Sequence, residues 1–314
     1  MLKDSFCAKF IKMKILLAAI ILFFTSILNA QKTFDNFFKP SDTLNTARAK
    51  SVIVTETVLS TGAIIGLSQL WYKDYAQSGF HFINDNNEWL QMDKLGHFFS
   101  AYHLGNASKD ALKWSGVGRK NQLIYGATFG FVFLSAIEVL DGYSQEWGAS
   151  SGDIIANGAG TGLLISQELL WHEQRITPKF SFHTTQYAAI RPNLLGKSLN
   201  EQILKDYNGQ TYWLSFNLHS FMKSSKIPRW LNLAVGYGAS GMISGNEDFF
   251  DPNLNFKETR MRRFHLSLDV DLTKIPTKNH FLKTFFLVFN TIKIPAPSLE
   301  FTASGVVNFR CLYF

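Results

Sequence analysis

Polar side chains that can bind a metal ion or move protons interrupt otherwise apolar stretches in the first half of this sequence. Asp93 and His97 are four residues apart, and so are Asp153 and Asn157, so on a helix each pair shares one face. Glu138 follows a long apolar run. Carboxylates gathered around one pocket repel one another unless a cation or shared protons neutralise them. Such oxygen and nitrogen donors suit a divalent metal ion or a general acid–base pair.

The elements that must position these residues are four stretches with helical periodicity, at residues 51–72, 93–114, 121–140 and 151–171. Short connections favour antiparallel neighbours. The start of the second helix, the end of the third and the start of the fourth then lie at the same end. We therefore expect a bundle of four helices over residues 44–174, with the polar residues together at one end and Gln145 and Glu146 in the loop above them.

Each of these polar residues, taken alone, also has a structural explanation. Asp93 and Asp153 can cap a helix or complement its dipole, and a single histidine such as His97 often belongs to a protein core. Glu138 fits this explanation least well, because burying a carboxylate late in an apolar helix is costly unless the carboxylate is paired. Two hypotheses therefore stay open, a functional pocket and a structural hydrogen-bond network.

In the functional hypothesis, His97 and Glu138 are the candidate catalytic residues that handle protons. Asp93 and Asp153 would hold a cation or orient His97. The sequence identifies no particular metal ion or cofactor. It contains neither Gly-x-Ser-x-Gly nor His-Glu-x-x-His, so the usual serine hydrolases and zinc proteases find no support.

Beyond Pro178 the hydrophobic period changes from 3.6 to 2. The alternation covers residues 212–220, 231–238 and 264–272, and residues 285–294 and 299–309 continue the series. We expect an antiparallel β-sheet or a small barrel-like region over residues 178–314. Segments of about ten residues with one apolar and one polar face are typical of membrane β-barrels. A soluble antiparallel sheet with one wet face has the same pattern, so both explanations stay open.

The N-terminal segment predicts export. Residues 1–30 combine several lysines, an apolar run over residues 15–24 and the small residue Ala30 before a suitable cleavage point. We expect a signal peptide over residues 1–30 and a linker over residues 31–43. A retained signal anchor is the alternative.

The composition excludes several classes of protein and partner. Charged residues make up 18% of the 314 residues, and 29 residues are Phe, which favours a surface in contact with membrane lipid. The net charge of +7 would fall to +4 after cleavage, because the signal peptide contains four Lys and one Asp. Without a dense stripe of Lys and Arg, nucleic acid is not an expected partner. Two cysteines are too few for a disulfide framework.

The polar residues also form a pattern that resembles a known family. Asp93-Lys94-Leu95-Gly96-His97-Phe98, then Glu138 and Gln145, then Ser151-Gly152-Asp153-Ile154-Ile155-Ala156-Asn157 resemble the YfiM-like family of uncharacterised bacterial envelope proteins, which are predicted periplasmic lipoproteins. The same order of residues is similar to the VanZ-like membrane proteins. The resemblance covers about residues 50–172. It differs in two respects, the missing lipoprotein cysteine after the apolar run and the additional β half.

The resemblance extends the candidate site without implying an established reaction. The residues that it carries over are Asp93, Lys94, His97, Glu138, Gln145, Asp153 and Asn157. Of these, His97 and Glu138 remain the candidate catalytic residues, and the other five become candidate binding residues.

We therefore expect an exported α+β protein of the cell envelope, at the outer membrane or on its periplasmic face. The expected function is that of a non-catalytic, membrane-associated structural or binding protein, with membrane lipid or other envelope components as partners. The alternative is a metal-dependent or acid–base enzyme or binder that acts on the headgroup of a lipid or cell-wall precursor through Asp93, His97, Glu138 and Asp153.

Overall fold

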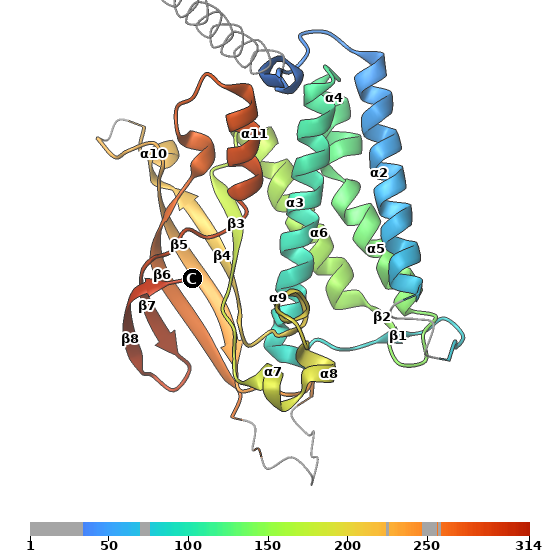
Figure 1. Cartoon of the computed structure of the whole chain (residues 1–314), viewed down its shortest axis with the longest axis vertical. Helices are drawn as coiled ribbons and strands as arrows, with labels where there is room; N and C mark the ends of the chain where they lie inside the picture. The colour runs from blue at the N-terminus through green and yellow to red at the C-terminus, as the bar shows by residue number, and fades with distance from the viewer. Residues whose placement is uncertain (1–33, 70–75, 224–225, 247–255, 257–258) are drawn as a thin grey trace, which may run out of the picture.

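A computed structural model describes residues 34–69, 76–223, 226–246, 256 and 259–314 of the chain. The predicted signal peptide lies outside these described residues. Within them, a helical half is followed by a six-stranded antiparallel sheet, and the two halves lie side by side (Figure 1). The predicted α+β class and the antiparallel pairing of the second half are thus confirmed.

The second and fourth predicted helices begin and end within one residue of the predicted positions, whereas the first begins five residues before residue 51, and its predicted end at residues 70–72 lies outside the described residues. The bounds of the long helices are α2 (Thr46–Leu67), α3 (Met92–Trp114), α5 (Phe129–Asp141) and α6 (Ser151–Leu170), and the short α4 (Arg119–Asn121) and π-helical η3 (Gln122–Ala127) precede α5. Ser150 caps α6, because its Oγ accepts a hydrogen bond from the backbone N–H of Asp153 at 3.2 Å. The third predicted helix is therefore not one continuous α-helix but η3 followed by α5.

The predicted bundle of four helices is not confirmed. Helix α3 packs closely against η3, α5 and α6, and a Cβ on Gly105 or Gly160 would lie within 2.4 Å of a backbone carbonyl oxygen of the neighbouring element. Helix α2 lies on the outside of this group and buries only Val52. Polar residues such as Lys50, Glu56 and Ser60 are spread among the apolar residues of α2, so no single apolar stripe directs this helix into the protein core.

The sheet of the second half has the strand order β3-β4-β5-β6-β7-β8. The bounds are β3 (Ile176–Phe182), β4 (Gln210–Asn217), β5 (Leu231–Ser240), β6 (Met261–Val270), β7 (Ala296–Thr302) and β8 (Val307–Tyr313). The two-residue strands β1 (Phe82–Ile83) and β2 (Ala149–Ser150) pair in parallel beside the helices. Short helical turns complete the described chain: η2 (Glu88–Gln91), α7 (Tyr187–Ile190), α8 (Pro192–Leu195), α9 (Leu199–Lys205), α10 (Leu218–Phe221) and η4 (Leu272–Lys274).

Two strand predictions at the C-terminal end were wrong. The first half of residues 285–294, predicted as a strand, belongs to helix α11 (His280–Phe289), which Asn279 caps by accepting a hydrogen bond from the Leu282 N–H at 2.7 Å. This segment lacks the polar alternation of the true strands. Residues 299–309, predicted as one strand, form the hairpin of β7 and β8, and Gly305 provides the positive φ of +85° that the turn requires.

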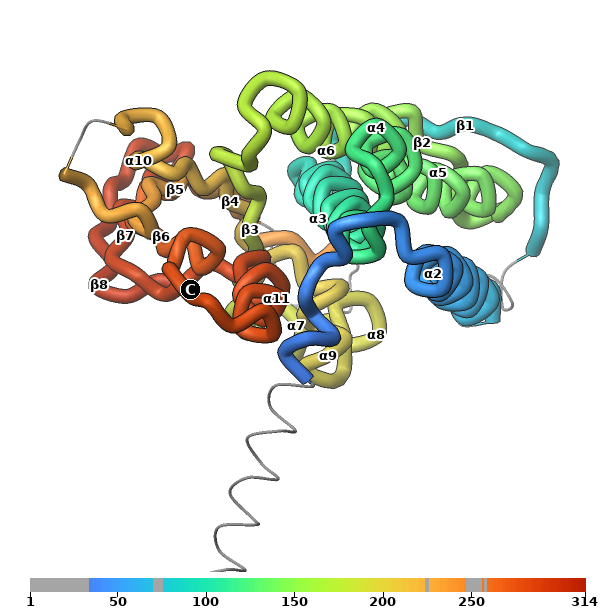
Figure 2. Tube along the Cα trace, turned by 90° about the horizontal axis from the view of Figure 1, so that it is seen from above, coloured from blue at the N-terminus to red at the C-terminus, as the bar shows by residue number. Residues whose placement is uncertain are grey.

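The sheet is strongly curved, as the view from above shows (Figure 2). Because of this curvature, Tyr313 of β8 reaches across to β4, where its hydroxyl lies 3.0 Å from Thr211 Oγ1. The edge of β3 is covered by the segment after α11, since the Lys293 N–H donates to the Phe180 carbonyl at 2.9 Å. The expected barrel-like region is thus a curved sheet with one edge covered by a non-strand segment.

The polar side chains of the sheet face inward and the apolar ones face outward. The buried side chains on the concave face include Ser215, Asn217, Asn232, His265, Ser267, Asp269, Ser298 and Glu300. The exposed side chains on the opposite face include Leu214, Val235, Phe264, Leu266, Leu268, Leu299 and Phe301. This is the reverse of a soluble antiparallel sheet, which buries its apolar face.

An ion-pair network makes the polar interior of the sheet possible. Lys179 Nζ lies 2.8 Å from Asp269 Oδ2, and Lys293 Nζ lies 3.9 Å from Asp269 Oδ1, with all three side chains fully buried. Lys293 Nζ also donates to the carbonyl oxygen of Leu268 at 2.7 Å, and Ser215 Oγ donates to Asp269 Oδ2 at 2.6 Å. These partners offset the cost of removing the charges from water.

Candidate functional site

The helical half brings six of the seven candidate site residues together at one end. We call the group formed by Asp93, Lys94, His97, Glu138, Asp153 and Asn157 the polar cluster. They come from the start of α3, the end of α5 and the start of α6, as the antiparallel arrangement predicted. Gln145 is exposed in the loop after α5, where its backbone N–H donates to the Ala76 carbonyl. The structure therefore does not place Gln145 in the polar cluster.

A left-handed turn sets the direction in which α3 begins. Trp89, Leu90 and Gln91 have φ values of 47°, 51° and 65°. Such values cost about 1–3 kcal/mol per non-glycine residue and persist only where the surroundings enforce them. Here the sheet enforces them, because the Tyr237 hydroxyl donates to the Leu90 carbonyl at 2.6 Å and Arg262 Nη1 donates to Gln91 Oε1 at 2.5 Å. The sheet thereby positions the first turn of α3, which carries part of the cluster.

Lys94 donates to one oxygen of each of three aspartates. Its Nζ lies 2.5 Å from Asp85 Oδ2, 3.0 Å from Asp153 Oδ2 and 3.1 Å from Asp93 Oδ2. Ser150 links this group to the start of α6, because its Oγ donates to Asp85 Oδ1 at 2.6 Å. One cation thus holds the loop before α3, the start of α3 and the start of α6 together.

The imidazole of His97 has two different environments. Its Nδ1 lies 3.1 Å from the amide oxygen of Asn157, so Nδ1–H donates to this oxygen. Its Nε2 faces three carboxylate oxygens, at 3.6 Å from Glu138 Oε1, 3.9 Å from Asp93 Oδ1 and 4.0 Å from Asp153 Oδ1. In the neutral ring, Nε2 therefore presents its lone pair to the centre of the carboxylates.

The carboxylates around His97 differ in how well they are satisfied. Glu138 Oε2 accepts from the backbone N–H of Ser150 at 3.0 Å, and Asp93 Oδ1 accepts from the Tyr207 hydroxyl at 3.0 Å. Asp153 Oδ1 is buried and has no hydrogen-bond partner within the described part of the chain. A buried carboxylate oxygen without a partner is costly, so a further positive group beside this atom would stabilise the cluster.

A cavity of about 320 Å³ leads to the polar cluster from the side of the sheet. Asp93 and His97 line it together with the hydroxyl-bearing Tyr207 and Tyr212. Its remaining walls are mainly apolar and come from Phe99, Leu134, Phe180, Ile203 and Leu204. Asp93 and His97 are the partly accessible members of the cluster, with side-chain exposures of 27% and 18%, whereas Asp153 and Glu138 lie behind them.

The electrostatics of the cluster follow from burial and from the excess of carboxylates. Burial and the nearby Asp93 carboxylate raise the pKa of Asp153 to about 6, against the opposing effects of His97 and Lys94. Burial disfavours a charged His97, but the surrounding carboxylates outweigh burial and raise the pKa of His97. For Asp85, the hydrogen bonds from Lys94 and Ser150 outweigh burial and lower its pKa. The cluster thus contains groups that can change charge close to neutral pH.

Sequence reasoning missed Asp85 and Tyr207. Asp85 lies in a run of turn-forming residues and shows no helical spacing with Lys94, so only the three-dimensional structure reveals this contact. Tyr207 follows α9, more than a hundred positions after Asp93, and belongs to the half of the chain in which only strands were expected. Ser150 caps α6, and its additional hydrogen bonds to Asp85 and Glu138 had no sequence signal.

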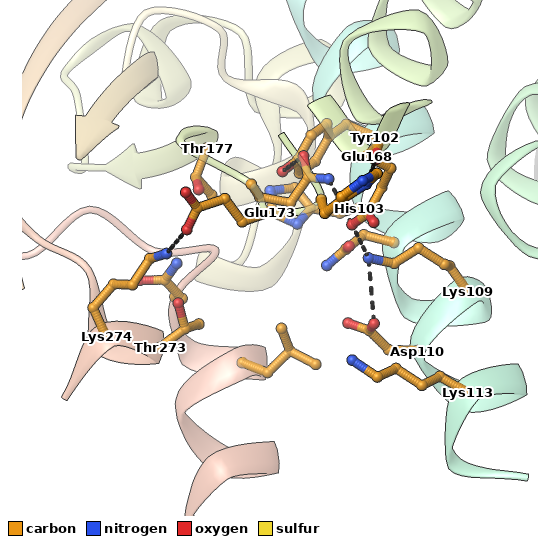
Figure 3. Close-up of a pocket in the computed structure, with 15 residues that line it drawn as sticks. Tyr102, His103, Lys109, Asp110, Lys113, Glu168, Glu173, Thr177, Thr273 and Lys274 are labelled. Atoms are coloured by element: carbon orange, nitrogen blue, oxygen red, sulfur yellow. Dashed lines mark hydrogen bonds and ion pairs between the residues drawn. The ribbon is translucent and has the colours of Figure 1, made fainter. Parts of the chain in front are cut away.

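A second polar pocket, of about 220 Å³, lies farther along α3 and is lined by residues from α3, α6, β3 and the segment around α11 (Figure 3). Five of its charged side chains, those of Lys109, Asp110, Glu168, Glu173 and Lys274, take part in ion pairs with one another. Lys109 Nζ lies 2.8 Å from Glu168 and 3.4 Å from Asp110, and Lys274 Nζ lies 3.0 Å from Glu173. A structural role as an ion-pair network therefore fits this pocket better than it fits the polar cluster.

The geometry of the polar cluster allows two kinds of chemistry. A lone pair on His97 Nε2 close to three carboxylate oxygens can hold a proton between them or contribute to the coordination of a cation. The cavity in front of Asp93 and His97 gives a ligand of moderate size access to these groups. In both cases Lys94 and Asn157 act by positioning the acidic groups and the imidazole.

Comparison with known proteins supports the predicted location of the chain. Residues 77–167 match the family model described as "Predicted periplasmic lipoprotein (DUF2279)". The predicted export to the cell envelope is confirmed by this match, whereas the finer resemblance to the YfiM-like and VanZ-like families is not. The matched region contains every member of the polar cluster and ends before the sheet. Neither the search of curated proteins nor that of solved structures found a match.

Proposed function

We propose that the protein is embedded in a membrane of the cell envelope through the apolar outer face of its sheet and through α2 and α5, as a non-catalytic structural or binding protein. The observation that carries this proposal is the reversed polarity of the sheet. Strands with polar residues inside and apolar residues outside are typical of proteins whose sheets face lipid.

The size of the exposed apolar face argues against water as its natural surroundings. Val235 is 47% exposed, Leu268 is 48% exposed and Phe309 is 65% exposed, and Phe264 and Phe301 on the same face are exposed as well. Burying one such side chain completely gains about 1.5–3 kcal/mol. A face of this size gains many times that amount in contact with acyl chains.

The outer helices have the same character. Thr46–Leu67 and Arg119–Asp141 are long and apolar enough to cross a membrane, and few of their residues are buried within the protein. Beside the second of these, an apolar groove of about 590 Å³ is lined by residues such as Ile124 and Leu169, and Arg119 and Lys120 lie along it. An acyl chain with an anionic headgroup matches this combination of apolar and basic residues.

A second candidate function is suggested by the cavity beside the polar cluster. Apolar walls that lead to Asp93 and His97 suit an amphipathic ligand whose polar end meets charged groups. The protein would then bind, or act on, the headgroup of a lipid or cell-wall precursor. His97 and Glu138 would handle protons in such a reaction, while Asp93 and Asp153 would hold the ligand or a cation.

The experiment for the first proposal places a charge on the outer face of the sheet. In lipid vesicles, Val235→Arg should lower the free energy of unfolding by about 2–4 kcal/mol, as arginine does in the middle of a bilayer. Leu199→Arg is the control, because Leu199 is 56% exposed but lies on the short helix α9 and not on a strand of the sheet. It should change stability by less than about 0.5 kcal/mol. Equal effects of the two substitutions, or extraction of the wild-type protein by alkaline carbonate without detergent, would refute the proposal.

A further inference from the structure

We propose that Asp93, His97, Glu138 and Asp153 form a binding site for one divalent transition-metal ion of the Zn²⁺ or Mn²⁺ class. The site goes beyond membrane association, because it assigns a specific ligand to the polar cluster. It does not depend on the sheet being in contact with lipid.

The positions of the donor atoms support this assignment. One donor atom each from Asp93, His97 and Asp153 lie within 4.8 Å of one another. Glu138 Oε1 lies 3.6 Å from His97 Nε2 and adds a fourth donor. Two ligands of a tetrahedral zinc ion are separated by about 3.4 Å, given bond lengths of about 2.0–2.2 Å. Inward shifts of up to about 0.7 Å per atom would bring the donors of Asp93, His97 and Asp153 to coordinating distance.

The unsatisfied oxygen of Asp153 is an independent indication of a ligand. The Asp153 residue is 4% exposed, and its Oδ1 points toward His97 Nε2 at 4.0 Å. Its other oxygen accepts from Lys94, whereas Oδ1 has no hydrogen-bond partner among the residues that the structure describes. Direct coordination to a metal ion would satisfy this oxygen.

The charge balance points in the same direction. Three carboxylates, from Asp85, Asp93 and Asp153, contact the permanent cation Lys94, and a fourth, from Glu138, lies beside His97. A divalent ion would remove most of the remaining negative charge. The arrangement also provides the outer contact that metal-binding histidines usually have, because His97 Nδ1–H donates to Asn157 and leaves Nε2 free to coordinate.

The type of donor selects the class of metal. Three carboxylate oxygens and one imidazole nitrogen suit Zn²⁺ and Mn²⁺, whereas Mg²⁺ and Ca²⁺ prefer oxygen ligands alone. We therefore expect binding of Zn²⁺ and Mn²⁺ at concentrations at which Mg²⁺ does not compete. The alternative is a doubly protonated His97 that neutralises the carboxylates without a metal.

The test uses the purified full chain in detergent with an affinity tag that contains no histidine. After chelator treatment and exchange into metal-free buffer, isothermal titration with Zn²⁺ should give one bound ion per chain. Asp153→Asn, which preserves shape and removes charge, should weaken the Kd by about 100-fold or more, because even outer-shell partners are worth about 10–100-fold. Asp110→Asn is the control, since Asp110 lies on the same helix as Asp93 but outside the cluster, and it should bind Zn²⁺ like the wild type.

A second measurement keeps the test independent of the variants' folding. Co²⁺ bound to the wild-type protein should give the intense visible absorption of a four-coordinate site, and Zn²⁺ should displace it. Absence of stoichiometric Zn²⁺ binding by the wild type overturns the proposal and favours the protonated histidine. Equal Zn²⁺ affinity of the folded wild type and Asp153→Asn also overturns it, because the ion would then bind elsewhere.

Discussion

The imidazole Nδ1 of His97 lies 3.1 Å from the amide oxygen of Asn157, and this contact orients the ring so that Nε2 faces three carboxylates. The two residues come from α3 and α6, and Asn157 is fully buried. The direction in which His97 Nε2 points therefore depends on how α3 and α6 pack against each other.

Replacing this acceptor should disturb the ring without removing any charge. Asn157→Leu should weaken Zn²⁺ binding by about 10–100-fold, as loss of an outer-shell partner does. Asn106→Leu, on α3 but beside the second polar pocket, is the matched control and should leave Zn²⁺ affinity unchanged. Titration of both variants checks the prediction. An unchanged affinity in folded Asn157→Leu would show that the Asn157 contact does not position the ring for binding.

Lys94 should be the most important single residue for the stability of the helical half. Lys94→Met removes the partner of three aspartates and should lower the free energy of unfolding by about 3–5 kcal/mol, the usual cost of leaving a buried charge unpaired. Lys113→Met, an exposed site at the other end of α3, should cost less than about 0.5 kcal/mol. Chemical denaturation with a chelator present measures both. A small loss in Lys94→Met would mean that the aspartates are protonated in the folded state.

The stability of the protein should depend on Asp85 in a pH-dependent way. The folded pKa of Asp85 lies below its ordinary value of 3.8, so the stabilisation is fully present above this value and disappears as the pH falls through the lower folded pKa. Asp85→Asn should therefore be less stable than the wild type at pH 6. The difference should shrink as the pH approaches about 2. Denaturation curves of both proteins across this pH range measure how the stability difference between them changes with pH. A difference that grows on acidification would contradict the prediction.

The hydrogen bond between Tyr207 and Asp93 should couple the two halves of the chain. In a double-mutant cycle with Tyr207→Phe and Asp93→Asn, we expect a coupling energy of about 1–2 kcal/mol, because the hydroxyl donates to a carboxylate. Tyr187→Phe combined with Asp93→Asn provides a tyrosine outside the cluster and should give a coupling near zero. A coupling near zero for Tyr207 as well would show that the hydroxyl is satisfied by water instead.

Local sequence patterns were sufficient to predict most of the helical half and the position of the polar cluster. The start of α6 follows from the cap at Ser150, and the shared face of Asp93 and His97 follows from their spacing on a helix. Short connections then bring the ends of α3, α5 and α6 together. The physical reason is that capping, helical periodicity and chain direction each depend on residues within one short segment. Such short-range features can be recognised from the sequence alone.

Only the tertiary structure decided which face of the sheet is buried and which residues complete the cluster. A period of two separates the face of Leu266 from that of His265, but the same alternation occurs whether the apolar face or the polar face points inward. The apolar run of α11 lacked such alternation, and its cap at Asn279 was overlooked. The contact of Asp93 with Tyr207 joins residues 114 positions apart, and the contact of Lys94 with Asp85 depends on how the loop before α3 packs against this helix. Contacts of this kind depend on packing between elements, and no local pattern in the sequence encodes them.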